Sequence, residues 1–408
     1  MNDHQKNASI ETSQDKFHTV FRLHENGEYK KAEKLYKELI DQFPDVWQLH
    51  FNLGLLYSDL GNHEEALITY QQGLAIHKDS VDLLYNSAIS QKALKKFDEA
   101  INSYQKALLL DPDDIDSRFN LAGIYRIMGR DKLSIEHYEK IVQAHPDHLP
   151  SLNNLAYVCH KDGQLQTAIE LYSKVLDLAP DHVGADFMLA ALTDTARQAA
   201  PEPYIREVFD DFSDHYESKL TEKLHYNLPS QLLKFILSNT SKSQFFSLLD
   251  LGCGTGLVGN QFKPYCNLLT GVDVSGRMLE LAKEKNIYNA LHREELYTFL
   301  SKESSTRYDI LIAADVFPYI GDLEHLFALA YRASSVDAVF AFSVEVEQND
   351  GLPKLQQSGR FAHSDSYIRG ISRKAGWQII ADEHLQLRME KDGWIDGCIY
   401  GLTKSHIT

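Results

Sequence analysis

One stretch decides the fold of the second half of the chain: Phe246-Ser247-Leu248-Leu249-Asp250-Leu251-Gly252-Cys253-Gly254-Thr255-Gly256-Leu257-Val258-Gly259. It predicts a short buried strand that ends in an acid, then a glycine-rich turn that opens a helix. Glycine lets the backbone approach a ligand closely because no Cβ blocks the way, and the helix adds its positive dipole end. The spacing Gly254-x-Gly256-x-x-Gly259 also matches a dinucleotide fingerprint, so the turn alone leaves the ligand open.

Two acids help to decide between the ligands. Asp250 stands two residues before Gly252, where a strand that admits a pyrophosphate usually stays apolar. Its carboxylate would repel phosphate but would suit a ligand that carries a cationic amino acid. About 20 residues on, Gly271-Val272-Asp273 predicts a second strand that ends in an acid, as ribose hydroxyls require. An NAD enzyme and a purely structural turn remain the alternatives.

The pattern Asp-x-Gly-x-Gly-x-Gly followed by Gly-Val-Asp resembles class I S-adenosylmethionine (SAM) methyltransferases. The resemblance implies a Rossmann-like domain with a mixed seven-stranded sheet over 241–408, SAM as cofactor and S-adenosylhomocysteine (SAH) as product. The glycine turn would hold the amino-acid end of SAM, Asp273 the ribose and Glu295 the adenine. The implied cofactor contacts in this half are Asp250, Gly252, Gly254, Gly256, Asp273, Val274, Met278 and Glu295.

Strand and helix signals alternate after the glycine turn, which predicts a parallel sheet. The strand 308–315 ends at Asp315, beside the place where such sheets bind ligands. Asp315 could orient the methyl acceptor or act as a base, or it could cap the next helix. The loop that follows lacks the Asn/Asp-Pro-Pro-Tyr sequence used on adenine amino groups, which argues against a nucleic-acid methylase. Segments 377–383 and 395–404 fit the closing hairpin of the family, and Arg360 and His363 are acceptor-site candidates, His363 as a catalytic residue.

The first half of the chain repeats with a period of 34 residues. Glycines at turns, alanines, tyrosines and prolines recur with this period. The pattern resembles the tetratricopeptide repeat (TPR). We expect five repeats and a capping helix, an α-solenoid domain over 13–196, in which each helical hairpin buries its apolar face against its neighbours. The repeated tyrosines are Tyr36, Tyr70, Tyr104, Tyr138 and Tyr172.

A row of asparagines within the repeats suggests a binding groove. These residues share one position on the first helix of successive hairpins, the helix that lines the concave groove of such a superhelix. Amides offer a donor and an acceptor to each peptide unit of an extended chain, so the row predicts a groove for a protein or peptide. Bonding to a helix carbonyl for structural reasons is the equal alternative. The four are Asn52, Asn86, Asn120 and Asn154.

The junction carries two prolines in three residues, at Pro201 and Pro203, which stop a helix. We expect a linker and helical lid segment over 197–240. The segment 204–217 resembles the aromatic and acidic stretch that precedes the core of many small-molecule methyltransferases. In those enzymes it packs over the cofactor, which makes Tyr216 a lid candidate and a further cofactor contact.

Composition narrows the function classes. The net charge of −17 over 408 residues argues against general affinity for nucleic acid or for anionic membranes. The four cysteines form no Cys-x-x-Cys pair, so neither a disulfide framework nor a metal site is expected. The polar N-terminus and the lack of a long apolar run predict a cytoplasmic protein without a membrane anchor.

Together these features predict a SAM-dependent methyltransferase whose TPR module recruits a protein or peptide substrate or partner, with nucleic acid disfavoured. A TPR adaptor whose second half binds SAM without catalysis is the alternative.

Overall fold

The computed structural model describes residues 16–212, 217, 220, 224–302, 307–390 and 393–404. The chain divides into two compact units, 1–178 and 179–408. Each unit is described by itself.

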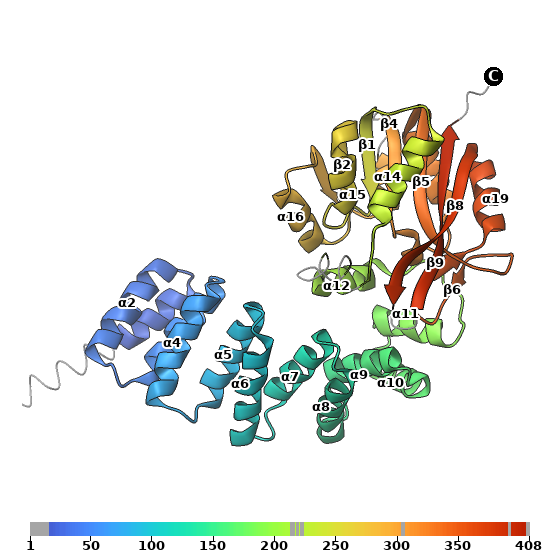
Figure 1. Cartoon of the computed structure of the whole chain (residues 1–408). Helices are drawn as coiled ribbons and strands as arrows, with labels where there is room; N and C mark the ends of the chain where they lie inside the picture. The colour runs from blue at the N-terminus through green and yellow to red at the C-terminus, as the bar shows by residue number, and fades with distance from the viewer. Residues whose placement is uncertain are drawn as a thin grey trace, which may run out of the picture. The chain divides into compact units, whose positions relative to one another are not determined.

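The first unit is a row of antiparallel helical hairpins (Figure 1). Each consecutive pair of helices packs together, and each hairpin packs on the next. The predicted helical repeat architecture is confirmed. Its helices are α2 (Tyr29–Gln42), α3 (Trp47–Asp59), α4 (His63–Ile76), α5 (Val81–Ala93), α6 (Phe97–Leu110), α7 (Ile115–Ile127), α8 (Asp131–Ala144), α9 (Leu149–Asp162) and α10 (Leu165–Leu178).

The repeat period controls the packing inside this unit. All five repeated tyrosines are buried. In the second repeat, a Cβ added at Gly54 would lie 2.3 Å from the ring of Tyr70, so only glycine lets α3 approach α4 this closely. The turn glycines adopt left-handed backbone conformations, as at Gly61 with φ +74°. Lys95, which replaces glycine at the equivalent turn, has a similar φ of 61°.

The second unit is an α/β domain, and helices also precede its first strand. The structure has it as α11 (Val183–Leu192), α12 (Glu202–Phe212), α14 (Leu228–Asn239), β1 (Phe245–Leu251), α15 (Leu257–Phe262), η3 (Lys263–Tyr265), β2 (Cys266–Asp273), α16 (Gly276–Glu284), β3 (Ala290–Arg293), α17 (Leu296–Lys302), β4 (Tyr308–Ala313), η4 (Phe317–Tyr319), α18 (Glu324–Ala333), β5 (Ser334–Val346), β6 (Lys354–Leu355), β7 (Phe361–His363), α19 (Asp365–Ala375), β8 (Trp377–Glu390) and β9 (Gly393–Lys404).

The strands form one mixed sheet. Its order is β3-β2-β1-β4-β5, with β1 to β5 parallel, and β9 then pairs antiparallel with both β5 and β8. These seven strands match the predicted mixed sheet, including the closing hairpin of β8 and β9. The structure adds two short strands, β6 and β7, which continue from the end of β5 and bring the sheet to nine.

Helices cover both faces of the sheet, as expected for parallel strands that are buried on both sides. One apolar core, around Leu248 and Ile310, lies between the sheet and helices α14 and α15. The other, around Phe327 and Phe340, lies between the sheet and helices α17, α18 and α19. The carboxyl ends of β1, β2, β4 and β5 therefore open at one edge, where loops rather than helices meet.

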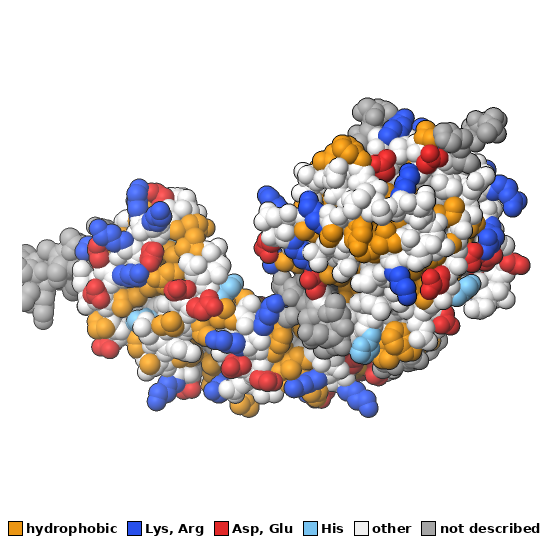
Figure 2. Space-filling model, turned by 45° about the horizontal axis from the view of Figure 1, so that its top comes forward, with side chains coloured by type: hydrophobic (Ala, Val, Ile, Leu, Met, Phe, Trp, Pro, Cys, Tyr) orange, Lys and Arg blue, Asp and Glu red, His pale blue; other side chains and the backbone are white. Residues whose placement is uncertain are grey.

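The segment before the sheet is attached to this same unit. Helix α11, which sequence analysis grouped with the repeats, lies in the 179–408 unit, and its Phe187 ring packs 5.1 Å from the ring of Tyr204 on α12. Within the part of the chain that the structure describes, no helix is both long enough and apolar enough to span a membrane. Acidic and basic side chains are intermingled over the visible face of each unit (Figure 2), without a broad basic surface there.

Candidate functional site

The glycine turn after β1 has a conformation that side chains rarely adopt. Gly252, Gly254 and Gly256 have φ values of +66°, +52° and +88°. A Cβ at Gly252 would lie 2.6 Å from a methyl of Val316, so the turn packs directly on the loop after β4. A Cβ at Gly254 would meet no atom within 4 Å. The turn is thus closed on one side by protein and open at Gly254, where a ligand could approach the backbone.

Asp273, at the end of β2, is bonded to this turn. One carboxylate oxygen accepts the Gly254 N–H at 2.8 Å, and the other accepts the Ser275 N–H at 2.9 Å. Burial raises the pKa of Asp273, while these backbone donors act in the opposite direction. Asp273 therefore links the two strand ends that sequence analysis assigned to the cofactor. Its contact with a ribose stays a prediction.

Asp250 lies behind the glycine turn and is only 1% exposed. The Tyr288 hydroxyl donates to its Oδ2 at 2.5 Å, and the Tyr288 ring packs so closely on the turn that a Cβ at Gly259 would lie 2.5 Å from it. Oδ1 is buried and meets no hydrogen-bond partner within normal geometry among the described residues. Burial raises the pKa of Asp250 to about 7, a change that the Tyr288 hydrogen bond opposes. Direct contact between Asp250 and a ligand stays a prediction.

The other cofactor candidates in this half lie at the starts of two helices. Ser275 caps α16 by accepting the Met278 N–H at 3.1 Å, and the Met278 side chain is buried. Glu295 caps α17 by accepting the Thr298 N–H at 2.9 Å, and Val274 is half-buried beside Asp273. Their cofactor roles stay predictions. Tyr216, the predicted lid residue, lies outside the described residues.

Helix α12 lies over both the glycine-turn side and the loop after β4. The Ser275 hydroxyl donates to Asp210 at 2.5 Å, and the Phe209 ring packs edge-on against Tyr319 with 5.3 Å between centroids. Sequence analysis placed a lid segment here but did not single out Asp210. The acidic and aromatic pattern of 204–217 was the available signal.

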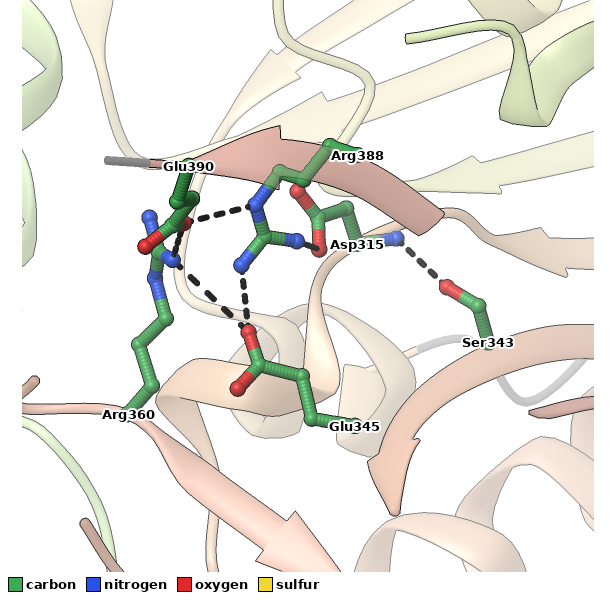
Figure 3. A network of polar contacts seen from close by, with 6 residues as sticks. All are labelled: Asp315, Ser343, Glu345, Arg360, Arg388 and Glu390. Atoms are coloured by element: carbon green, nitrogen blue, oxygen red, sulfur yellow. Dashed lines mark hydrogen bonds and ion pairs between the residues drawn. The ribbon is translucent and has the colours of Figure 1, made fainter. Parts of the chain in front are cut away.

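Charged side chains gather at the ends of β4 and β5 (Figure 3). Arg388, which is 1% exposed, contacts Asp315 at 2.5 Å, Glu390 at 3.0 Å and also Glu345. Arg360 pairs with Glu390 and lies 3.7 Å from Glu345. We call Asp315, Glu345, Arg360, Arg388 and Glu390 the charged cluster. It includes the predicted Asp315 and Arg360, whereas sequence analysis missed the other three.

The pKa values of the cluster carboxylates Glu345 and Glu390 are shifted in opposite directions. Burial raises the pKa of Glu345 against the pull of Arg388 and Arg360. For Glu390 burial also acts upward, but the two arginines together hold its pKa below the usual range. Asp315 has a left-handed φ of 58°, and its N–H donates to the Ser343 hydroxyl at 2.9 Å. This strained turn directs its carboxylate towards Arg388.

His363 is the last residue of β7 and is buried. Its Nε2 lies 3.0 Å from the Ile320 carbonyl and 3.1 Å from the Gly321 carbonyl, on the loop after η4, and burial lowers its pKa to about 4. The Gly321 N–H donates to the Gln198 carbonyl at 2.8 Å, which attaches the predicted linker to the domain. This geometry suits a group that holds the loop, and a catalytic role for His363 stays a prediction.

The asparagine row lies on α3, α5, α7 and α9. Asn52, Asn86 and Asn120 each donate to the carbonyl four residues earlier, at 2.8, 2.9 and 3.0 Å. Asn120 also donates to the Tyr85 hydroxyl at 3.3 Å. These bonds fit the structural alternative but engage the amide nitrogen only. Like Asn154, all are half-buried, so a groove role stays a prediction.

The closing hairpin brings together three groups that the sequence kept apart. One ligand atom each of Asp382, His384 and Cys398 lies within 4.8 Å of the others. Arg369 pairs with Asp382 at 2.8 Å, and burial raises the pKa of the Cys398 thiol to about 11. Both features disfavour a bound cation, because the carboxylate is already neutralised and the thiol is held in its protonated form.

The glycine-turn region fits the SAM molecule that the sequence resemblance implies. The buried Thr255 hydroxyl and Asp250 Oδ1 have no partner among the described residues, and the space beside Gly254 is open. An adenosyl amino acid carries an ammonium, a carboxylate and ribose hydroxyls, which could meet such groups. The local acids suit its cationic end better than they would suit a diphosphate.

Comparisons with known proteins agree with this reading of the two units. Residues 249–340 match the methyltransferase domain family, and residues 23–80, 92–129 and 113–181 match tetratricopeptide repeat families. The malonyl-[acyl-carrier protein] O-methyltransferase of Bacillus cereus is 28% identical over 116 residues, which cover 28% of this chain and 42% of that protein. A probable SAM-dependent methyltransferase of Saccharomyces cerevisiae is 31% identical over 136 residues, which cover 31% and 46%. The chain spans less than half the length of these curated relatives.

Solved structures of both kinds resemble parts of the chain. The N-methyltransferase NodS from Bradyrhizobium japonicum, in complex with SAH, has a TM-score of 0.35 and 16% identity, and covers 43% of this chain and 85% of its own. YrrB, a TPR protein with an unusual peptide-binding site, has a TM-score of 0.39 and 18% identity, and covers 45% and 96%.

Proposed function

Because the chain carries a methyltransferase domain together with tetratricopeptide repeats, we propose that it is an SAM-dependent methyltransferase whose repeat module recruits a protein or peptide. The observation that carries the proposal is the bonding of Asp273 to the Gly254 N–H across two strand ends. This bond shapes the open glycine turn and holds a carboxylate beside it. The turn lies in the domain that matches a methyltransferase family.

The chain's own residues would each have a stated task. The turn at Gly252–Gly256 would hold the amino-acid end of SAM, Asp273 the ribose and Glu295 the adenine. Helix α12 would exclude water, since Asp210 and Phe209 contact the two sides of the site. SAM supplies an activated methyl group, and the protein's part is positioning, which is a large share of catalysis for such a displacement.

The repeat module would recruit the substrate or a separate partner along the asparagine row. In Asn52, Asn86 and Asn120 the amide nitrogen donates to the helix, which leaves the carbonyl oxygen to accept from a bound peptide N–H. We place this activity in the cytoplasm, a proposal supported by four buried cysteines without disulfides.

Transfer of labelled methyl groups tests the enzymatic part. The full chain, incubated with methyl-tritiated SAM and a cell extract, should label an acceptor, and Asp273→Ala should lose most of the label. The control is Glu280→Ala, an exposed residue on α16 that pairs only with Arg277 among the described residues, and it should keep full transfer. SAM binding without any transfer would favour the adaptor alternative.

A second experiment tests the groove. The variant Asn86→Ala/Asn120→Ala should keep its repeat fold by circular dichroism, because each lost hydrogen bond is half-exposed and contributes about 1 kcal/mol or less. It should also label the extract less efficiently while SAH binding is unchanged. Equal labelling by the variant and the wild type would remove the groove from the proposal.

A further inference from the structure

We propose that the methyl acceptor is an amine, bound as its ammonium ion beside the charged cluster. This inference rests on the proposed function and names its substrate class. It comes from the charge, burial and contacts of the five cluster side chains.

The charge of the cluster is the first step. Its three carboxylates face two guanidinium groups, which leaves one formal negative charge at the acceptor end. Buried charges are costly unless they are paired, so a site with this excess is completed by a cation. An acceptor that carries a carboxylate or phosphate would add a second uncompensated negative charge.

Both arginines are paired with the acids. Arg388 is 1% exposed and uses Nε, Nη1 and Nη2 on the three carboxylates. Arg360 uses Nη1 on Glu390, with Glu345 at 3.7 Å. An anionic acceptor that displaced these pairs would leave a buried carboxylate unpaired, which costs several kcal/mol.

The carboxylates retain acceptor capacity. Hydrogen bonds and ion pairs among the described residues reach one oxygen each of Asp315, Glu345 and Glu390. In Figure 3 the second oxygen of Glu345 points away from both arginines. An ammonium offers three N–H donors, which match such oxygens as charge-assisted hydrogen bonds.

The cluster adjoins the proposed cofactor turn. Val316 follows Asp315 directly and packs on Gly252, with a methyl 2.6 Å from where a Cβ would lie. The methyl donor and the cluster are therefore separated by one loop turn, and the excess negative charge lies beside the place where charge moves during transfer.

The reaction balances for an amine. The ammonium first gives a proton to a carboxylate, for which Glu345 is suited because burial raises its pKa. The freed nitrogen lone pair then forms the N–C bond while the C–S bond breaks and its electron pair returns to sulfur. The positive charge thus passes from sulfonium to the methylated ammonium. After this proton transfer the cluster carries no net charge, and loss of the proton from Glu345 to water then restores the negative charge beside the methylated ammonium.

Sinefungin is a suitable probe, because it replaces the S–CH₃ group of SAM with a C–NH₃⁺ group and so places an ammonium at the transfer point. Calorimetry on the full chain should give a Kd for sinefungin about tenfold below that for neutral SAH, a difference of about 1.4 kcal/mol. In Glu345→Gln, and separately in Asp315→Asn, this preference should fall towards one while SAH still binds. Glu383→Gln, an exposed residue on β8, should keep it.

The possible outcomes distinguish a failure of the proposed function from a failure of the amine inference alone. If the wild type does not bind SAH, the proposed function fails and this inference fails with it. If SAH binds but sinefungin binds no tighter, or if the preference survives in both cluster variants, the function stands and the amine acceptor is overturned. Retained SAH binding also shows that a variant is folded.

Discussion

The two ends of the site are built in opposite ways. At the glycine turn, backbone N–H groups make the contacts that fix the geometry, as in the hydrogen bond from Gly254 to Asp273. The residues come from one strand-turn-helix segment and from the strand beside it. In the charged cluster, side chains make these contacts. Arg388 pairs with carboxylates at the ends of β4 and β5 and on its own strand. Backbone geometry thus forms the proposed cofactor end, while paired charges form the proposed acceptor end.

The difference indicates what each end can tolerate. A site formed by backbone groups loses ligand affinity when a side chain is added, because the ligand or a neighbouring loop occupies the space that the side chain needs. A paired-charge site fails when one partner is removed, because the remaining charges stay buried. Three variants test this contrast.

The largest effect is expected from Arg388→Met. The change leaves the buried Glu345 and the half-buried Asp315 and Glu390 with one arginine, so the free energy of unfolding should fall by about 3–5 kcal/mol. Urea unfolding measures this loss. The control is Arg369→Met, whose ion pairs with Asp365 and Asp382 are 41% exposed on the arginine side and contribute about 1 kcal/mol or less. Equal losses in the two variants would show that the cluster is not a paired-charge core.

The next largest effect is expected from Gly252→Ala. The new Cβ would overlap Val316 and require a left-handed φ, so the turn should shift and SAH affinity should fall by at least about 100-fold, near 2.7 kcal/mol. Calorimetry measures the Kd. Gly370→Ala on α19, where a Cβ meets no atom within 4 Å, should bind SAH as the wild type does. An unchanged Kd for Gly252→Ala would remove the turn from the cofactor site.

A smaller effect is expected from Asp250→Asn, and it depends on pH. The pKa of Asp250 is about 7 in the folded protein against 3.8 normally, so the folded state favours the protonated acid. Stability from this group is complete below pH 4 and is lost as pH rises towards 7. Between pH 5 and pH 8 the wild type should lose roughly 2 kcal/mol more than the variant in urea unfolding. If the stabilities of the wild type and the variant change equally with pH, the pKa of Asp250 is not raised in the folded protein.

Much of the fold could be predicted because its signals are local. A 34-residue period specifies the repeat unit wherever it occurs, and the five tyrosines are all buried as that period requires. The glycine turn is also local, since φ > 0 and bare backbone demand glycine at particular positions. The alternation of strands and helices predicted the parallel strands, and the family resemblance of segments 377–383 and 395–404 predicted the closing hairpin.

The parts that sequence analysis missed depend on long-range contacts. Arg388 lies 73 residues from Asp315, and Tyr288 lies 38 residues from Asp250. Neither distance in sequence carries a pattern, because a β-strand shows only which face a residue occupies and not which partner it meets. The two short strands β6 and β7 lack a periodic signal for the same reason, as they are only two and three residues long.

The most direct test of the central claim is calorimetric titration of the full chain with SAH and, separately, with NAD. At pH 8, above the pKa of about 7 of Asp250, the account predicts one SAH site per chain and no NAD binding, because the carboxylates of Asp250 and Asp273 suit an adenosyl amino acid and oppose a diphosphate. Absence of SAH binding, or NAD binding as tight as SAH, would contradict it.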